Sequence, residues 1–389
     1  MILVDATPLQ TGHRYRGIGT YTAGFLDALI GELASPRLRL MIQPPHTDDH
    51  PALASLLRRA HVSPITIRRP RWGRSRLEWL YSLLTLGPYV AMARPRLYHA
   101  LEAYGLVKIP GVTTVATLHD LIPFHTSTVA PERRTIDHRL GLARYARLLR
   151  RVEMVLAVSE ATRNDAIGRL GVDADRIRVV YGACDDARFS PRPASEVDAV
   201  VERYKLRRPY ILHVGSADPY KNTRRAIDAF DLFLQRTHDN CALYIPGMWP
   251  VQPVEELQNR HRRLLADGKL GLLGYVAADD LPALYCGAEM MLFPSLVEGF
   301  GIPVLEAMRC GVPVVTSNVS SLPEVAGEAA LLVDPYDTEA MAHAMESLAT
   351  DSSLRARLVE RGHQRAAQFT FQRTARETLA VYREFGADV

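Results

Sequence analysis

The chain alternates short β-branched runs with longer amphipathic segments from end to end. Short continuous apolar runs predict buried strands, and apolar positions at helical spacing predict helices between them. In the first half the predicted strands are Met1–Asp5, Leu38–Ile42, Ile65–Arg69, Leu97–Leu101, Val112–Leu118, Met154–Ser159 and Ile177–Tyr181. In the second half they are Tyr210–Val214, Ala242–Pro246, Leu272–Tyr275, Met290–Pro294, Pro313–Thr316 and Ala330–Val333. This order is typical of parallel sheets with crossover helices.

The pattern divides into two doubly wound α/β domains. The segment Phe189–Ala194 carries two prolines and predicts a linker, so the domains are residues 1–190 and 191–369. A last amphipathic helix is predicted over Phe369–Phe385. Ligands of such sheets bind beyond the carboxyl ends of the strands, so the loops at those ends are the candidate site and the two domains are expected to enclose a cleft.

Composition narrows the class of protein. With 47% apolar and 23% charged residues and a net charge of +4, the chain reads as globular, and its charge does not specify nucleic acid binding. The four cysteines form no C-x-x-C pair, which argues against a zinc site or a disulfide scaffold. The first residues read as a strand, and the apolar stretch Leu83–Ala93 is too short to span a membrane. We therefore expect a cytoplasmic protein that is at most peripheral on a membrane.

The most informative motif follows the strand that ends at Pro294. It reads Glu298-Gly-Phe-Gly-Ile-Pro-Val-Leu-Glu306, a glycine turn that leads into a helix. The glycines let the backbone approach a ligand, and the free N–H groups at a helix start favour a phosphate. Glu298 and Glu306 lie too far apart along the chain to form an acid–base pair on one water, so separate hydroxyl-binding roles fit better. The alternative is an ordinary capped turn with acidic residues near the helix start.

A second motif contains Lys221, one of only four lysines in the chain. It lies in Gly215-Ser-Ala-Asp-Pro-Tyr-Lys-Asn, after the strand at Tyr210–Val214. A compact ammonium group at the end of a strand is suited to a diphosphate. The alternative is a solvated loop lysine.

Two further motifs follow strands of the first domain. Gly17 and Gly19 resemble a weak phosphate loop, but the full dinucleotide fingerprint is absent, which argues against a nicotinamide cofactor. His119 and Asp120 stand at the carboxyl end of an apolar strand, where His119 can contact a sugar or acceptor hydroxyl and Asp120 can fix its ring or act as a base. The alternative for Gly17 and Gly19 is a plain turn, and the alternative for His119 is a core histidine. A further histidine, His99, is predicted to be structural.

Taken together, these motifs resemble the retaining glycosyltransferases of the GT-B group usually called family 4, or group 1. Glu298 to Glu306 looks like the E-x7-E motif of that family, and Gly311-Val-Pro-Val-Val-Thr follows it as is usual there. The resemblance covers nearly the whole chain. It implies two Rossmann-like domains that face a cleft, the first on the acceptor side and the second binding the nucleotide sugar, with residues 370–389 crossing back to the first.

The resemblance also implies roles for single residues. Glu298 would hold hydroxyls of the donor sugar, Glu306 the ribose hydroxyls and Lys221 the diphosphate. His119 and Asp120 would lie at the sugar and acceptor side. The remaining donor-binding positions would be Gly299, Phe300, Gly301, Ile302, Tyr275, Val276, Gly17 and Gly19, with Tyr275 and Val276 beside the nucleobase.

One position departs from the family pattern. Many relatives carry an arginine five residues before the lysine, and this chain has Ser216 there. The second cation for the diphosphate then comes from elsewhere, from Arg224 or from an arginine of the first domain, or is missing.

The resemblance implies a reaction without a cofactor or a divalent metal. Lys221 and the helix N–H groups would stabilise the leaving diphosphate. The family retains the anomeric configuration, and no carboxylate is obviously placed as a covalent nucleophile. Front-face attack is therefore expected.

The motifs look most like those of bacterial enzymes that assemble surface polysaccharides and glycolipids. We expect GDP-mannose as the donor, with UDP-glucose or another UDP-sugar next, and a glycan or lipid-linked acceptor on the first domain. Arginines near tryptophans suit an anionic lipid surface, although a solvated basic face is an equal alternative. These residues are Arg68, Arg69, Arg71, Arg74 and Arg76 around Trp72 and Trp79, with a second arginine-rich stretch at Arg133–Arg151.

Two other functions stay open. The chain could act on a soluble sugar, as a disaccharide synthase or phosphorylase of the same fold. From another class, it could be a catalytically idle protein that binds a nucleotide sugar for a partner enzyme. The intact Lys221, Glu298 and Glu306 argue against the idle partner.

Overall fold

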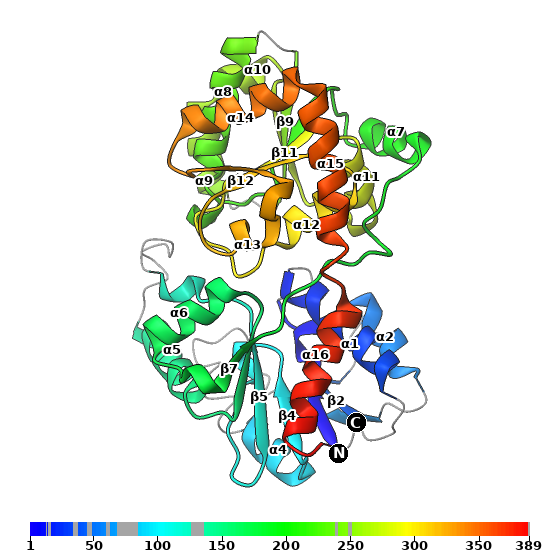
Figure 1. Ribbon diagram of the computed structural model, residues 1–389, viewed down its shortest axis with the longest axis vertical. Helices are drawn as coiled ribbons and strands as arrows, with labels where there is room; N and C mark the ends of the chain where they lie inside the picture. Colours follow the sequence, from blue (N-terminus) through cyan, green and yellow to red (C-terminus); the bar gives the residue numbers. More distant parts are fainter. Residues whose placement is uncertain are drawn as a thin grey trace. The chain divides into compact units, whose positions relative to one another are not determined.

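The computed structural model of the chain describes residues 1–12, 14, 17–33, 38–44, 49–59, 63–67, 85–125, 136–237, 240–247 and 251–387 (Figure 1). It divides into two compact units. Unit 1 contains described residues within Met1–Ala183 together with the C-terminal segment from Thr370, and unit 2 contains those within Cys184–Phe369. Each unit is built on its own parallel sheet, and each is described below by itself.

The described part of unit 1 holds a seven-stranded parallel sheet in the order β3-β2-β1-β4-β5-β6-β7. Its strands are β1 (Ile2–Asp5), β2 (Leu38–Ile42), β3 (Ser63–Thr66), β4 (Leu97–Ala100), β5 (Thr113–Leu118), β6 (Met154–Ala157) and β7 (Ile177–Val179). Its main helices are α1 (Gly17–Glu32), α2 (Pro51–Leu57), α4 (Gly87–Ala93), α5 (Ile136–Leu149), α6 (Glu160–Leu170) and α16 (Phe371–Glu384). Short 3-10 turns are η1 (Thr7–Leu9), η3 (Ala103–Gly105), η4 (Ile122–Phe124) and η6 (Ala174–Arg176).

The described part of unit 2 holds a six-stranded parallel sheet in the order β10-β9-β8-β11-β12-β13. Its strands are β8 (Tyr210–Leu212), β9 (Ala242–Pro246), β10 (Leu270–Gly274), β11 (Met290–Phe293), β12 (Val314–Ser317) and β13 (Leu331–Val333). Its helices are α7 (Ala194–Arg203), α8 (Thr223–Thr237), α9 (Val251–Arg260), α10 (Arg262–Ala266), α11 (Leu281–Cys286), α12 (Ile302–Arg309), α13 (Leu322–Ala326), α14 (Thr338–Thr350) and α15 (Ser352–Ala366). Short turns are η7 (Pro219–Lys221), η8 (Ala278–Asp280) and η9 (Gly327–Ala329).

Every strand expected from the sequence has a counterpart in one of these two sheets. The largest shift is at β3, which the sequence predicted over Ile65–Arg69 and which the structure gives as Ser63–Thr66; Arg68 and Arg69 lie outside the described residues. β3 is the edge strand of its sheet, paired only with β2 among the described strands. An edge position tolerates Pro64, whose missing N–H would break a ladder inside the sheet.

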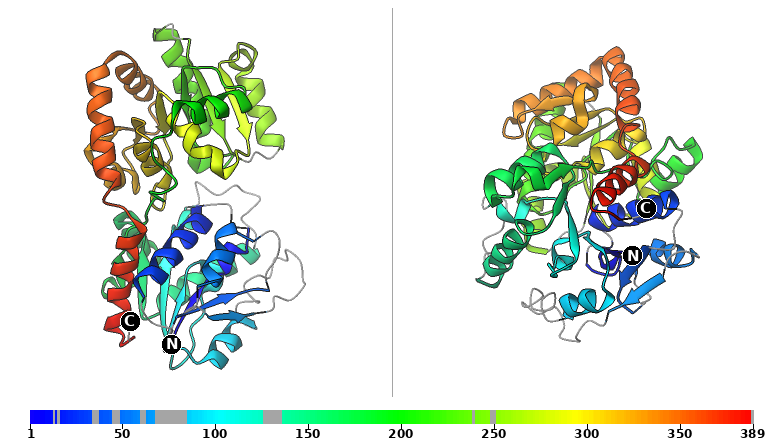
Figure 2. Two further views of the ribbon diagram at one scale, coloured as in Figure 1. Left: turned by 90° about the vertical axis from the view of Figure 1, so that its right-hand side faces the viewer. Right: turned by 60° about the horizontal axis from the view of Figure 1, so that its bottom comes forward.

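The C-terminal helix α16 packs beside α1 in unit 1 (Figure 2). Gly24 of α1 leaves room for the ring of Phe371, because a Cβ atom there would lie 2.2 Å from Phe371 Cε2. On the sheet side, Tyr382 Oη lies 2.5 Å from Nδ1 of the buried His99 on β4. His99 Nε2 contacts Thr117 Oγ1 at 2.8 Å, so His99 has the structural role that the sequence indicated.

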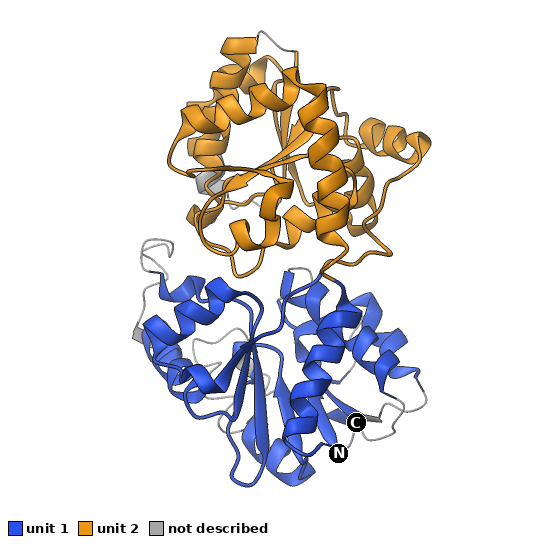
Figure 3. Ribbon diagram, in the orientation of Figure 1, with its two compact units in different colours: residues 1–125, 131–183, 370–389 blue, residues 126–130, 184–369 orange. Residues whose placement is uncertain are grey.

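The boundary between the units falls at Ala183, earlier than the linker predicted at Phe189–Ala194 (Figure 3). The physical reason is the packing of Phe189, which is fully buried and meets the ring of Tyr285 edge-on at 5.8 Å in unit 2. The Cys184 N–H also donates to the Phe369 carbonyl. These contacts hold the residues after Ala183 on unit 2.

Candidate active site

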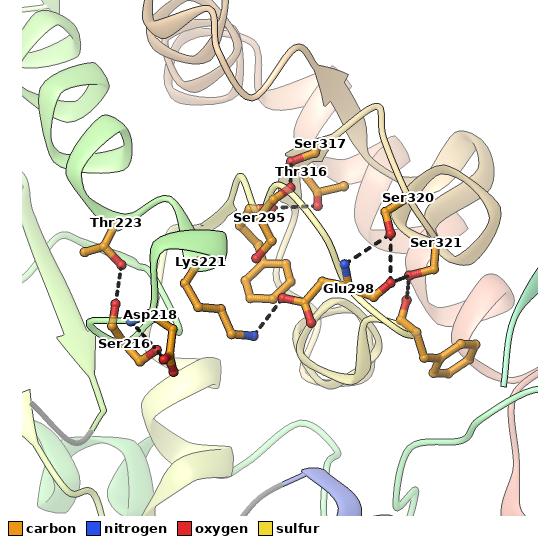
Figure 4. Close-up of polar contacts among 12 residues, drawn as sticks. Ser216, Asp218, Lys221, Thr223, Ser295, Glu298, Thr316, Ser317, Ser320 and Ser321 are labelled. Atoms are coloured by element: carbon orange, nitrogen blue, oxygen red, sulfur yellow. Dashed lines mark hydrogen bonds and ion pairs between the residues drawn. The ribbon is translucent and has the colours of Figure 1, made fainter. Parts of the chain in front are cut away.

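Three strand-end loops of unit 2 meet at one edge of its sheet. They follow β8, β11 and β12, which are neighbours in the strand order. Carboxyl ends of adjacent parallel strands lie side by side, so residues far apart in the sequence come together there. Figure 4 shows Lys221 from the first loop, Glu298 from the second and Ser320 and Ser321 from the third.

Lys221 and Glu298 form an ion pair across two of these loops. Lys221 Nζ donates to Glu298 Oε1 at 2.7 Å, and both side chains are largely buried. The ammonium group also lies over the rings of Phe293 and Tyr220, 5.0 and 5.3 Å from their centroids. The low accessibility and the aromatic faces strengthen the pair relative to an exposed one.

The loop that carries Lys221 is fixed by the residue after it. Asn222 is buried in a left-handed conformation with φ of 58°, and its Nδ2 donates to the carbonyls of Pro294 and Pro335 at 3.0 and 2.7 Å. The Leu296 N–H donates to the Tyr220 carbonyl at 2.7 Å. The β8 and β11 loops are therefore joined by backbone and side-chain hydrogen bonds beside the ion pair.

The glycine turn after Glu298 leads directly into α12. Gly301 caps the helix with φ of 117°, and a Cβ atom there would lie 2.9 Å from Leu322 Cδ2. Only glycine fits this conformation and this close packing. Helix α12 begins at Ile302, with Pro303 in its first turn as the sequence indicated. At this helix start Pro303 has no N–H and the Val304 N–H donates to the Gly301 carbonyl at 3.0 Å, so Ile302 is the first-turn residue whose N–H suits an anion.

Glu306 lies on α12, in the turn that follows the start of the helix at Ile302. Tyr285 Oη donates to Glu306 Oε2 at 2.8 Å. Burial raises the pKa of Glu306 to about 7, while the Tyr285 hydrogen bond and the positive charges of Arg188 and Lys221 act in the opposite direction. Asp185 adds to the upward shift of that pKa. Glu306 is therefore poised to change its charge near neutral pH.

Ser216 takes part in the β8 loop through local hydrogen bonds. Its hydroxyl donates to Asp218 Oδ2 at 3.1 Å, and its carbonyl accepts from Thr223 Oγ1 at 3.0 Å. Thr223 in turn contacts the buried His213, whose pKa is lowered by burial to about 4. Arg224, one expected substitute for the family arginine, lies 4.0 Å from Glu256 and is well exposed. Arg188 is the cation besides Lys221 whose charge acts on Glu306.

Tyr275 and Val276 follow β10 at the same edge of the sheet. The strand ends at Gly274 with φ of 67°, after which Tyr275 is 60% exposed and Val276 is buried. The next residue, Ala277, donates its N–H to Tyr204 Oη at 3.1 Å, which ties this loop to α7. An exposed aromatic ring on an anchored loop offers a face for stacking.

In unit 1 the structure brings the start of α1 next to the end of β5. Gly17 and Gly19 lie in the first turn of α1, and the ring of Tyr21 one turn later meets His119 edge-on at 4.7 Å. His119 Nε2 lies 2.8 Å from the Leu101 carbonyl oxygen. Asp120 Oδ1 accepts from the Ile122 N–H at 3.0 Å. The first two turns of α1 and the end of β5 are therefore joined through Tyr21 and His119.

Several residues of the site were missed by sequence reasoning. Tyr285, Ser320 and Ser321 contact Glu306 or the Glu298 loop, and nothing in their local sequence marked them. Arg188 lies immediately before the predicted linker Phe189–Ala194 and was not singled out. Of the proposed membrane-facing residues, the arginines and tryptophans between 68 and 79 lie outside the described residues.

In the part of the chain that the structure describes, neither a cluster of metal-ligating side chains nor a membrane-spanning helix occurs. Within it, His, Cys, Asp and Glu side chains do not gather in groups of three or more that could hold a metal ion. Within it too, each helix is too short or too polar to cross a membrane.

Comparison with known proteins agrees with the fold. The family model for glycosyl transferases group 1 matches residues 196–365, and the model for glycosyltransferase family 4 matches residues 17–188. O-antigen chain mannosyltransferase B of Escherichia coli is 36% identical over 273 residues, which are 69% of this chain and 70% of that protein. The serotype-specific mannosyltransferase WbdA of Escherichia coli is 26% identical over 96% of this chain, which spans 47% of WbdA.

Solved structures agree on the architecture. WaaG, a glycosyltransferase involved in lipopolysaccharide biosynthesis, has a TM-score of 0.74 at 15% identity and covers 98% of this chain and 99% of its own. HepE of Anabaena, solved with UDP and glucose, has a TM-score of 0.72 at 21% identity over 97% of this chain and 99% of its own. The two Rossmann-like sheets define the GT-B fold. The chain belongs to the group 1, family 4 glycosyltransferases, and it is a glycosyltransferase enzyme.

Proposed function

We propose that the chain transfers mannose from GDP-mannose to a growing glycan or lipid-linked acceptor of a surface polysaccharide. The observation that carries the proposal is the Lys221–Glu298 ion pair before the start of α12, together with Glu306, on whose carboxylate the charge of Lys221 acts. The choice of mannose is supported by relatives named as mannosyltransferases, one of them 36% identical to this chain. The polysaccharide acceptor is supported by the same names.

The donor would lie along the strand ends of unit 2. Lys221 would bind the diphosphate, with the N–H groups of Gly299–Ile302 beside it. Glu298 would accept hydrogen bonds from hydroxyls of the sugar, and Glu306, as a carboxylate, from those of the ribose. Tyr275 and Val276 would border the nucleobase.

Transfer would proceed with retention and without a divalent metal. The bond from the sugar C1 to the diphosphate oxygen breaks while the acceptor oxygen forms its bond to C1 on the same face. The departing phosphate takes the proton of the acceptor hydroxyl, so no protein base is required. Lys221 would stabilise the charge that develops on the phosphate, which is the group where charge grows in the transition state.

Unit 1 would supply the acceptor side. His119 and Asp120 are proposed to contact acceptor or sugar hydroxyls. Helix α5 and the residues after it expose a basic surface that includes Arg139, Arg147, Arg150 and Arg151, with Leu140 54% exposed among them. Such a surface suits peripheral contact with anionic headgroups, on which a lipid-linked acceptor would be held.

The test is transfer from labelled nucleotide sugars. Purified protein is incubated in EDTA with GDP-mannose or UDP-glucose and with lipid-linked or soluble glycan acceptors. Mannose transfer to the lipid-linked acceptor is the predicted result. Transfer from UDP-glucose only, or to soluble sugars only, would overturn the donor or acceptor assignment, and binding without turnover on any acceptor would favour the idle partner.

A further inference from the structure

Ser320 and Ser321 bind the backbone of the residue that carries the site's central carboxylate (Figure 4). Ser320 Oγ accepts from the Glu298 N–H at 3.1 Å and donates to the Glu298 carbonyl oxygen at 2.8 Å. One hydroxyl therefore satisfies both backbone groups of Glu298. Neither group belongs to a helix or a strand, so without Ser320 the N–H would need another partner and the carbonyl would keep its bond from Ser321.

Ser321 extends the contact along the same loop. Its Oγ lies 2.7 Å from the Phe300 carbonyl oxygen and 3.0 Å from that of Glu298. Ser321 is fully buried. The two serines together thus contact the loop on both sides of Gly299, and the next residue, Leu322, packs against Gly301.

Ser320 makes its contacts from an unfavourable backbone conformation. Its φ is 60°, in the left-handed region that residues other than glycine rarely adopt. A glycine would relieve the strain but would lack the hydroxyl. Strained residues of this kind cluster at sites where the surrounding structure has a use for them.

We propose that Ser320 and Ser321 form a serine latch that positions Glu298 for the donor sugar. This inference depends on the proposed function, because it assumes that Glu298 binds the sugar. The latch holds the backbone and Lys221 holds the carboxylate, so binding energy is not spent on ordering the loop. Ser320 and Ser321 are positioning residues and do not touch the reacting atoms.

The first experiment compares a nucleotide with and without its sugar. The ratio of the dissociation constants of GDP and GDP-mannose, and of UDP and UDP-glucose, is measured for wild type and for Ser320→Ala, Ser320→Gly and Ser321→Ala. Ser320 is exposed, so its replacement leaves no cavity. We expect the sugar's contribution to affinity to fall about tenfold and turnover to fall with it, while affinity for the nucleotide alone changes little.

Two comparisons separate positioning from stability. Ser320→Gly removes the hydroxyl and relieves the strain, whereas Ser320→Ala removes the hydroxyl and keeps the strain, so the two variants should differ in stability but share the loss of the sugar's contribution. Ser317→Ala is the matched control. Ser317 Oγ donates at 2.6 Å to the carbonyl oxygen of Ser295, which lies in the loop that carries Glu298, and not to Glu298 itself. Ser317→Ala should lower the stability of the fold and leave the ratio of the dissociation constants of nucleotide and nucleotide sugar unchanged.

Hydrogen–deuterium exchange tests the latch even if no nucleotide sugar binds. The Glu298 amide should exchange about tenfold faster or more in Ser320→Gly than in wild type, and not in Ser317→Ala. If wild type binds none of GDP, GDP-mannose, UDP and UDP-glucose, the proposed function is overturned. Exchange at the Glu298 amide still tests the latch in that case. Unchanged exchange at Glu298, or an unchanged ratio in both Ser320 variants, would overturn the latch.

Discussion

Lys221 Nζ donates to Glu298 Oε1 at 2.7 Å, so the two groups proposed to bind different parts of the donor also bind each other. A buried charge without a partner is costly, and this pair removes that cost for both groups. Donor binding then exchanges partners, with the diphosphate taking Lys221 and the sugar hydroxyls taking Glu298.

The exchange of partners predicts opposite effects for the two halves of the pair. Glu298→Gln should bind GDP at least as tightly as wild type, since Lys221 is released and a negative charge near the diphosphate is removed. Turnover should fall by about two to three orders of magnitude. Lys221→Met should lose both GDP binding and turnover. Calorimetry and a transfer assay measure the two quantities, with Lys269→Met as a control because its ammonium group contacts Asn240. Wild-type kinetics for both variants would contradict the account.

The pKa of Glu306 predicts a proton linked to nucleotide binding. It is raised by burial to about 7, and ribose hydroxyls favour the carboxylate form, so binding should release up to one proton. Below pH 7 the affinity should fall by up to about tenfold per pH unit. Calorimetry in buffers of different ionisation enthalpy counts the proton. Glu306→Gln should bind weakly at every pH, and Tyr285→Phe should move the midpoint upward because it removes a donor to the carboxylate. No proton release by wild type would contradict this.

The buried His99 predicts acid sensitivity of unit 1. Burial lowers its pKa to about 3, below the value of 6.5 expected in the unfolded chain. The unfolded state therefore binds the proton first, and stability is full above pH 6.5 and is lost as the pH falls toward 3. Between pH 6.5 and 5 the loss should be about 2 kcal/mol. Urea titrations at several pH values should show this loss of unfolding free energy in wild type and not in His99→Gln. The variant should already be less stable than wild type at pH 7. The same loss in both would refute the assignment.

Unit 2 should respond less to acid than unit 1. Burial lowers the pKa of His213 to about 4, so this residue makes unit 2 less stable as the pH falls, as His99 does in unit 1. Glu306 acts in the opposite direction, because its raised pKa stabilises the folded state most below 4.5 and least above 7. Peptide-resolved hydrogen exchange at pH 5 and pH 7 distinguishes the two units. Equal acid sensitivity would mean that one of these two groups is misassigned.

The contact between Gly24 and Phe371 predicts that α16 cannot tolerate a side chain on α1 at this point. A Cβ atom at Gly24 would lie 2.2 Å from the Phe371 ring, too close without a shift of the helix. Gly24→Ala should destabilise unit 1 by about 1 to 3 kcal/mol. Gly31→Ala is the control, since a Cβ there meets nothing within 4 Å. Equal melting temperatures for the two variants would show that α16 does not pack as described.

The sequence predicted the sheets well because buried parallel strands are continuous apolar runs, which stand out at β9 and β11 without any knowledge of tertiary contacts. It also singled out Lys221, Glu298 and Glu306 as candidates by residue type and spacing, and the structure brings Lys221 and Glu298 together. It did not predict Tyr285, Ser320 or Arg188. Their roles come from contacts between loops and helices distant in the sequence, and serine or tyrosine at such positions carries no local signal. The unit boundary was missed for the same reason, since the packing of Phe189 on Tyr285 decides it.

The most direct test of the account is a thermal-shift panel in EDTA with GDP, UDP, ADP and dTDP and their sugars, on wild type and Lys221→Met. A ligand that binds the folded state raises the melting temperature by mass action. The account predicts that GDP and GDP-mannose shift wild type most, that added Mg²⁺ changes little, and that Lys221→Met abolishes the shift. A shift that appears only with Mg²⁺, or that persists in Lys221→Met, would contradict the proposal that Lys221 binds the diphosphate without a metal.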